Sequence, residues 1–397
     1  MLIKECFLSN RIWSKTEMFL ILSTLLLLFS HSAFSGPAEI LWEIEIPSEF
    51  NSCICGVDFT DDGGAICVGE IGSEDNEITS LFLLKLQPDG AIQWEETTGW
   101  GLATSGQDVL QISGGYVVCG SIFSGTDYNG FVAKFDYFGN VLWCREIHNI
   151  NDDALYDISE TADGGFVAAG YTKSTGAGGK DFWLVRVDAS GNLEWTRTFG
   201  TAMSDAAYSV VALANGGFAL GGGSAGNFYI VITDSSGVGV NAFSFNNEGH
   251  ETARCLKESS EGGFLLAGST MQPGNYESDI WLVRLDTSGN MIWSLVIEGD
   301  DNDSAWDIVE PETGGFIVLA NTMSSGRASY DAILYRLDYQ GNIIWEMNAG
   351  NAFWNTGCGL AINPEGNLLF GGRTLTDASE CFLPWIVYTT PEDLLNW

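Results

Sequence analysis

Side chains able to bind a cation or a ligand recur at one position along the chain, eleven residues before the first glycine of each Gly-Gly or Gly-Asn pair. Carboxylate oxygens gathered around one mouth could hold a hard cation such as calcium. The same groups could instead cap backbone N–H groups in local turns. No cofactor is predicted, and calcium is the only metal the pattern suggests. Ser52 and Ala103 hold the first two positions, and the candidate ligand-binding residues are Asp153, Asp205, Glu251, Asp303 and Asn355.

Residues for catalysis are sparse. Outside the N-terminal segment the chain has two histidines, His148 and His250, at positions that are not equivalent in the pattern. The G-x-S-x-G elbow, the H-E-x-x-H helix and the phosphate-binding loop are absent from the sequence. The many acids offer no single pair that stands out as the two carboxylates of a glycosidase. No catalytic residue is predicted, and a binding protein is favoured over an enzyme.

The glycine pairs belong to an internal repeat with the pattern D-G-G-F-x-x-x-G, as in "DGGFVAAG" from Asp163. Successive copies are 46 to 52 residues apart. Seven copies at such a period indicate a stacked or circular repeat architecture. The first glycines are Gly63, Gly114, Gly164, Gly216, Gly262, Gly314 and Gly366.

Each repeat contains four short runs rich in β-branched and aromatic residues, which predict strands. Asp-Gly-Gly joins the first two runs and Asp-x-x-Gly-Asn the last two, and both supply the positive-φ residues of tight hairpins. Four antiparallel strands in one repeat form a propeller blade. The segment 38–46 resembles a fourth strand without its blade, and the last repeat lacks one. The sequence therefore predicts an all-β, seven-bladed propeller closed by the N-terminal strand.

A tryptophan follows the Asp-x-x-Gly-Asn turn at a fixed distance in most repeats. An indole at one place in every sheet can pack on the neighbouring sheet while its N–H finds a carbonyl. A row of sugar-binding platforms is the alternative interpretation. We expect these residues to form the core between blades: Trp42, Trp94, Trp143, Trp195, Trp293 and Trp345. In the fourth repeat Asn241 stands where the tryptophan is expected, which predicts looser packing there.

The charge and the N-terminus indicate where the protein works. Acidic residues outnumber basic ones by 52 to 16, which disfavours nucleic acid and anionic membranes as partners. A basic start, the apolar run 18–29 and small residues before Gly36 predict a signal peptide. The expected organisation is a signal peptide at 1–35, the propeller at 36–390 and a short tail at 391–397. A secreted, periplasmic or cell-surface protein, with no membrane insertion after signal removal, follows.

Eight cysteines remain after the predicted cleavage, and an exported chain can oxidise them. Eight cysteines allow 105 pairings, and their spacing does not choose among these. The expectation is a mixture of buried thiols and one or two bridges, and paired C-x-x-C knuckles of a zinc site are absent from the sequence.

The repeats "VRVDASGNLEW" and "VRLDTSGNMIW" resemble the tryptophan-docking motif of PQQ-type propellers, which include quinoprotein dehydrogenases and outer-membrane assembly scaffolds. Over nearly the whole mature chain the sequence is also similar to secreted bacterial and archaeal propellers. The resemblance implies the fold and leaves the activity open, since propellers host unrelated functions. A quinoprotein would imply adjacent disulfide-bonded cysteines, whereas Ile54 separates Cys53 from Cys55.

Long, variable connections lie before the inner strand and between the middle strands, on one face of the predicted ring. Rigid blades that present variable loops make this face the expected binding surface. The prediction is a non-catalytic binding propeller with a polysaccharide or protein partner. An extracellular carbohydrate-active hydrolase or lyase and an envelope assembly scaffold are the alternatives.

Overall fold

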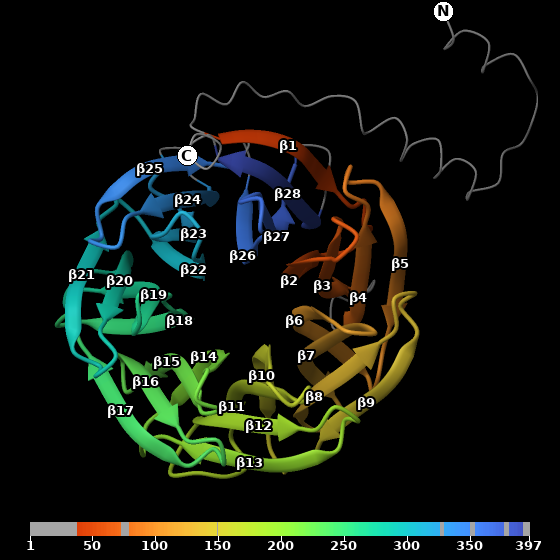
Figure 1. Cartoon of the computed structure of the whole chain (residues 1–397), viewed down its shortest axis with the longest axis horizontal. Helices are drawn as coiled ribbons and strands as arrows, with labels where there is room; N and C mark the ends of the chain where they lie inside the picture. The colour runs from red at the N-terminus through yellow and green to blue at the C-terminus, as the bar shows by residue number, and fades with distance from the viewer. Residues whose placement is uncertain are drawn as a thin grey trace, which may run out of the picture. The chain divides into compact units, whose positions relative to one another are not determined.

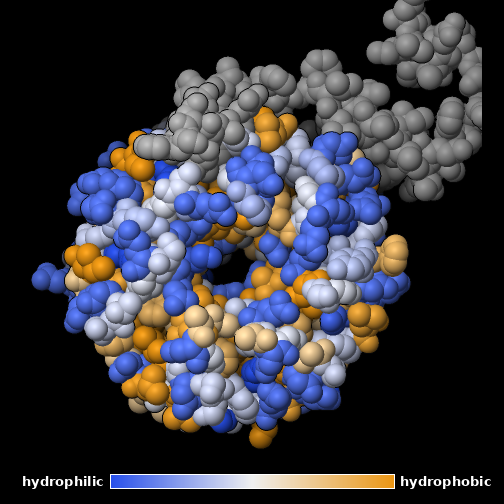
Figure 2. Space-filling model, viewed as in Figure 1, coloured by the Kyte–Doolittle hydropathy of each residue, from blue (hydrophilic) through white to orange (hydrophobic). Residues whose placement is uncertain are grey.

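The computed structural model describes residues 38–72, 79–148, 150–325, 329–349, 354–376 and 381–391. These residues form 28 β-strands in seven four-stranded antiparallel sheets. The sheets are arranged as blades around a central opening, as the colour sequence in Figure 1 and the surface in Figure 2 show. The prediction of a seven-bladed, all-β propeller is confirmed. Among the described residues there is no helix able to cross a bilayer. The predicted signal peptide at 1–35 and the tail beyond Pro391 lie outside the described residues.

In each of the first six blades the strands are ordered from the centre outward along the chain. The first three blades are formed by β2 (Ser52–Phe59), β3 (Ala65–Gly72), β4 (Thr79–Leu86), β5 (Ile92–Thr98), β6 (Ala103–Ile112), β7 (Gly115–Phe123), β8 (Tyr128–Phe135), β9 (Val141–Ile147), β10 (Asp153–Glu160), β11 (Phe166–Thr172), β12 (Asp181–Val187) and β13 (Leu193–Phe199).

The next three blades repeat this arrangement. They are formed by β14 (Asp205–Ala212), β15 (Phe218–Ser224), β16 (Asn227–Thr233), β17 (Gly239–Phe245), β18 (His250–Glu258), β19 (Phe264–Met271), β20 (Asp279–Leu285), β21 (Met291–Ile297), β22 (Asp303–Val309), β23 (Phe316–Thr322), β24 (Asp331–Leu337) and β25 (Ile343–Asn348).

The seventh blade joins both ends of the chain. It contains β26 (Asn355–Ile362), β27 (Leu368–Thr374), β28 (Leu383–Pro391) and, as its outer strand, β1 (Ala38–Glu45). Strand β1 pairs antiparallel with β28 in a register that places Glu43 opposite Val387. Closure removes the open sheet edge that β28 would otherwise present.

The two faces of the ring differ in their connections. Short turns join the inner strand to the second strand and the third strand to the fourth. The other connections lie on the opposite face, called here the loop-rich face. In the third blade these are the β11–β12 connection and the chain between β13 and β14, which meet where Asp205 N donates to Lys180 O. The loop-rich face is therefore the one where each inner strand begins.

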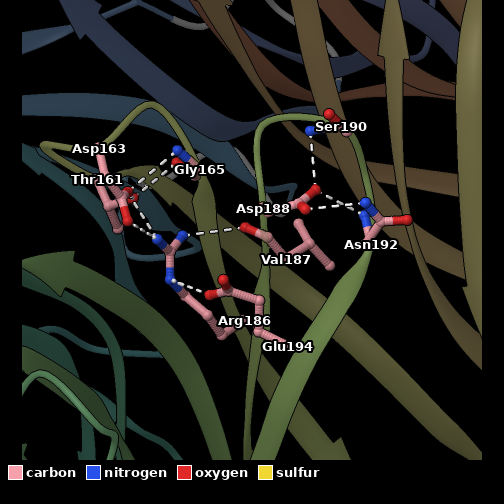
Figure 3. Close-up of polar contacts among 9 residues, drawn as sticks. All are labelled: Thr161, Asp163, Gly165, Arg186, Val187, Asp188, Ser190, Asn192 and Glu194. Atoms are coloured by element: carbon pink, nitrogen blue, oxygen red, sulfur yellow. Dashed lines mark hydrogen bonds and ion pairs between the residues drawn. The ribbon is translucent and has the colours of Figure 1, made fainter.

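A buried cation holds the first turn of the third blade (Figure 3). Arg186 on β12 donates to both carboxylate oxygens of Asp163, at 2.6 and 2.7 Å, and to Val187 O. The Asp163 carboxylate also accepts from Gly165 N and from the Thr161 hydroxyl. Hydrogen bonds from the Thr161 hydroxyl, the Arg186 guanidinium and Gly165 N hold the pKa of Asp163 well below its ordinary value. Arg186, one of the few basic residues of the protein, therefore stabilises a turn of the fold.

The Asp-x-x-Gly-Asn turn closes the outer hairpin (Figure 3). One oxygen of Asp188 accepts from the backbone N–H groups of Ser190 and Asn192, and the other accepts from the Asn192 side chain. Gly191 has φ of +79°, the left-handed conformation that favours glycine. The motif therefore specifies a turn in which one carboxylate satisfies three donors.

The tryptophan of each motif lies against the glycine of the next blade's motif. At Gly191 a Cβ atom would lie 2.6 Å from Cδ2 of Trp143, and at Gly341 the matching distance to Trp293 is 3.0 Å. The Trp293 Nε1 donates to Tyr339 O at 2.9 Å. The indole N–H groups of Trp42 and Trp94 donate in the same way to Pro88 O and Tyr137 O. Trp42, Trp94 and Trp195 face Gly90, Gly139 and Gly237 in the same way, and Trp345 is buried between the sixth and seventh blades.

In the fourth blade a phenylalanine takes the place of the missing tryptophan. Asn241 pairs with Ile232 on the neighbouring strand, and its atoms are not among the three nearest to a Cβ at the next blade's glycine, Gly289. Phe243, two residues later on the same face, lies against Gly289 instead. Phe243 packs against the hydrophobic cluster between the fourth and fifth blades, which includes Ala219, Leu256 and Trp281.

Candidate functional site

The wall of the central channel is built on one β-bulge in each inner strand. In β10 the ladder to β11 shifts between Leu155 and Asp157, so that Tyr156 has no partner opposite it. Such a bulge bends a strand and re-aims the extra side chain. The channel has a volume of about 400 Å³, and all seven bulged residues line it: Cys55, Gln107, Tyr156, Tyr208, Arg254, Trp306 and Cys358.

Four of these side chains form a stack across neighbouring blades. The rings of Tyr156 and Tyr208 are 5.2 Å apart and nearly parallel. The guanidinium of Arg254 lies 4.8 Å from the ring of Tyr208 and 4.8 Å from that of Trp306. A cation between two aromatic faces is attracted to both. This aromatic–arginine stack covers one side of the channel, from the third to the sixth blade.

Thiols occupy the opposite side. Cys53 Sγ and Cys55 Sγ are 3.4 Å apart, and all eight cysteines outside the predicted signal peptide are free thiols, so the expected one or two bridges are not formed. The hydrogen bond between Cys55 and Cys53, followed by burial, raises the pKa of Cys55 well above its ordinary value. Burial raises the pKa of Cys358 to about 12. Because the thiolate is the reactive form of cysteine, these groups are poor nucleophiles.

Three aspartates that follow the bulges bind the backbone of the next blade. Asp108 accepts from Ile158 N, Asp157 from Val210 N, and Asp307 from Leu360 N at 2.7 Å. Each donor lies beside the bulge of its own strand, where the ladder is interrupted. These three aspartates therefore connect the inner strands of adjacent blades.

Burial dominates the titration of these aspartates. It raises the pKa of Asp307 to about 6. Burial, and then the charge of Asp157, raise the pKa of Asp108 well above its ordinary value, and the two side chains are hydrogen-bonded. The pKa of Asp157 is raised by burial too. This carboxyl pair is committed to backbone donors and to each other, which leaves it poorly suited to protonating a glycosidic oxygen.

A second pocket opens on the loop-rich face between the fifth and seventh blades. Its volume is about 350 Å³, and it shares Arg254 and Trp306 with the channel. Arg373 and Thr356 also line it. The ring of Trp354 in its wall lies 5.0 Å from that of Tyr330 and 5.8 Å from that of Phe382. The pocket therefore combines two guanidinium groups with an aromatic wall.

The predicted ligand-binding residues all lie at the first or second position of an inner strand and are buried. Asp153 accepts from Lys173 N and from the Ser174 hydroxyl. Asp303 makes the same two contacts one half-ring away, with Met323 N and the Ser324 hydroxyl. Asp303 also lines the pocket on the loop-rich face.

The other three are likewise bonded close to their own strand. Asp205 accepts from Thr201 N, Glu251 from Gly249 N, and Asn355 from the Thr374 hydroxyl. Among the described residues, no three His, Cys, Asp or Glu side chains are grouped so as to hold a metal ion. Calcium binding stays a prediction. In the second blade the first turn is one residue shorter, so Thr104 stands at the equivalent place rather than Ala103.

The bulged residues and the channel aspartates were not among the predicted site residues. A signal was present in three of the seven repeats, where "QDV", "YDI" and "WDI" stand three to four residues after the inner strand begins. The bulge itself carries no such signal because its seven side chains share no chemical type. His148 and His250 are exposed, away from the channel and the pocket, and His148 lies 3.4 Å from Glu146.

Comparison with known proteins supports the fold and gives no family. No protein-family model matches the chain, and no curated protein matches it significantly. Solved propellers do match. One is the N-terminal part of BBS1 in a complex with ARL6, with a TM-score of 0.54, 10% identity and coverage of 90% of this chain and 97% of that one. Another is YCF48 bound to a D1 peptide, with a TM-score of 0.51, 10% identity and coverage of 92% and 99%. Sqt1 from Chaetomium thermophilum has a TM-score of 0.50, 11% identity and coverage of 87% and 86%.

Proposed function

We propose that this protein is an exported, non-catalytic binding propeller that holds a protein or polysaccharide partner on its loop-rich face. The observation that carries the proposal is the pocket on that face, which joins aromatic rings to two arginines. Serine, asparagine and threonine side chains complete its lining, and polar groups that converge beside aromatic rings are typical of ligand sites. The channel carboxylates, by contrast, are occupied by backbone donors.

Two of the similar structures favour a partner-binding role. The BBS1 propeller is in a complex with ARL6, and the YCF48 propeller is bound to a peptide. At 10% identity these likenesses concern the fold, and they support binding only as a common use of such rings. Export rests on the predicted signal peptide, and a relation to PQQ-type propellers rests on the tryptophan-docking motif.

A scaffold at the cell envelope is a second candidate because the outer strands expose apolar side chains. Leu142, Ile292 and Ile344 each precede the docking tryptophan on their strand and are more than half exposed. Exposed apolar surface is a feature of protein-interaction sites. A scaffold would use this rim rather than the loop-rich face.

The two candidates differ in which substitutions abolish binding. Purified protein would be immobilised and tested against glycan arrays and extracts of the source cells. Tyr276→Arg alters the loop-rich face, Ala189→Arg the turn face and Ile292→Arg the rim, all at exposed positions. The proposal expects a partner to be lost with Tyr276→Arg alone. Loss with Ile292→Arg alone would favour the scaffold, and turnover of a glycan by the parent protein would refute a non-catalytic role.

A further inference from the structure

Two arginines in the loop-rich pocket stand out in a strongly acidic protein. The chain has 52 acidic and 16 basic residues. Lys85, Lys173 and Arg186 each form an ion pair with an aspartate. Within the described part of the chain, neither Arg254 nor Arg373 has a carboxylate at ion-pair distance. Both are half-buried. Unneutralised guanidinium groups in such a place indicate a site for an anion supplied by a ligand.

The two guanidinium groups converge from different blades. Arg254 on β18 is held between the rings of Tyr208 and Trp306. Arg373 on β27 lies 4.5 Å from the ring of Phe382. Both are close enough to Cys358 to oppose the rise of its pKa. Stacking on rings fixes the plane of a guanidinium and leaves its N–H edge available, the arrangement that binds a carboxylate through two parallel hydrogen bonds.

Two further donors in the pocket have no protein partner. Thr356 is 9% exposed and its Oγ1 makes no hydrogen bond to a described residue. The Nε1 of Trp354 is likewise buried and unpaired among the described residues. Both residues line the pocket. A buried donor without a partner costs about 1–3 kcal/mol, so native proteins keep such groups where a ligand or water satisfies them. Residues that carry four such donors thus line one pocket, and the one carboxylate in the lining, Asp303, accepts from Met323 N and the Ser324 hydroxyl.

We propose that this pocket binds the C-terminal carboxylate of a basic peptide or protein tail, with Arg254 and Arg373 as the carboxylate ligands. The inference rests on the proposed function and names its partner. A pocket of about 350 Å³ has room for a carboxylate and one apolar side chain against the wall of Tyr330 and Trp354.

The charge of the whole protein favours this ligand over an acidic polysaccharide. A formal charge of −36 attracts a cationic chain and repels a polyanion as it approaches. A basic peptide whose only negative group is its terminal carboxylate has a net positive charge and is attracted to the acidic protein. Its carboxylate enters the pocket between the arginines, while lysines behind it face the acidic surface.

The test uses the full mature protein and two peptide pools. Both have the sequence acetyl-Lys-Gly-Lys-Gly-Lys-X, with X varied over the apolar residues. One pool ends in a free carboxylate and the other in an amide, so the net charge of the carboxylate pool is one unit less positive. Isothermal titration and tryptophan fluorescence measure binding. We expect the free acids to bind at least tenfold more tightly than the amides, against the order that net charge alone would give.

Substitutions locate the site. Arg373→Met and Arg254→Met should each weaken binding of the free acid at least tenfold and leave the amide unchanged. Arg254→Lys, which keeps a cation between the two rings, separates loss of charge from misfolding and should retain part of the affinity. Arg197→Met is the matched control, because Arg197 lies over Trp195 on an outer strand. Urea unfolding checks that each variant is folded.

The outcomes separate this inference from the proposed function. Equal binding of acid and amide, or equal binding by Arg373→Met and the parent, would overturn the carboxylate site. If a partner is still lost with Tyr276→Arg, the loop-rich face remains the binding surface and only its ligand is wrong. Binding of tetragalacturonate in place of every peptide would also overturn the inference. If every loop-face variant still bound both the peptide and the partner, the carboxylate site and the proposed function would both be refuted.

Discussion

Replacing Gly191 by alanine should destabilise the propeller more than replacing Gly164, in the same blade, by alanine. Both glycines close a hairpin and both have a left-handed backbone, with φ of +79° and +77°. An alanine in that conformation costs about 1–2 kcal/mol at either position. Backbone strain is therefore common to the two variants, and any difference between them measures something else.

The difference is the docking of the indole. A Cβ atom at Gly164 would meet nothing within 4 Å, whereas at Gly191 it would lie 2.6 Å from Cδ2 and from Cε3 of Trp143. Carbon atoms in contact prefer about 3.5–4.0 Å, so the indole must move by roughly 1 Å. Overpacking of this kind costs about 1–3 kcal/mol. The expected loss of unfolding free energy is about 1–2 kcal/mol for Gly164→Ala and about 2–5 kcal/mol for Gly191→Ala.

Urea unfolding followed by circular dichroism, with the same m value for all proteins, gives the comparison. Two further proteins carry Trp143→Leu with and without Gly191→Ala. With the indole gone, the alanine should cost only the backbone strain seen at Gly164. Equal losses for the two single variants, or an unchanged loss in the Trp143→Leu background, would refute the docking argument.

Three other perturbations have defined outcomes. Because burial raises the pKa of Asp307 from 3.8 to about 6, folding holds this proton more tightly and stability falls as pH rises from about 4 to about 6. Asp307→Asn keeps an acceptor for Leu360 N–H. Its free energy of unfolding in urea, relative to that of the parent, should increase by up to about 3 kcal/mol between pH 4 and pH 7. A difference that does not change with pH would contradict the raised pKa of Asp307. Trp293→Phe removes the donation to Tyr339 O and should cost about 1 kcal/mol, and a larger loss than that of Trp293→Leu would be inconsistent. Deleting residues 38–46 leaves β28 as an open edge, so size-exclusion chromatography should show self-association that a peptide of that segment reverses.

Much of the fold could be predicted because its signals are local. The turn at Asp188 needs a glycine with positive φ and a carboxylate for three donors, and both requirements are visible as letters at fixed spacing. The ring closure could be inferred from a strand without a blade at one end and a blade without a strand at the other. The glycine of the Asp-x-x-Gly-Asn motif has two roles: it adopts the positive φ of the turn, and it leaves room for the tryptophan of the preceding blade.

The site was harder to predict because it depends on a bulge. A bulge adds one residue to one strand without any required side chain, so Tyr156, Arg254 and Cys358 look unrelated in the sequence. The ring of acids was predictable as a repeated position, yet burial at the strand entry shows that its members satisfy nearby donors. The looser packing expected at Asn241 was compensated two residues later by Phe243, on the same face of the strand.

The constant bulge has a consequence for how such rings diversify. At each of the seven bulges the main chain bends the strand, so the side chain of the bulged residue is not needed for strand pairing. Arg254 and Trp306 occupy two of these places and Cys55 a third. Substitutions at these seven positions would change the chemistry of the channel lining while the blades kept their hydrogen bonds. The lining of such rings can therefore diversify without changes elsewhere in the fold.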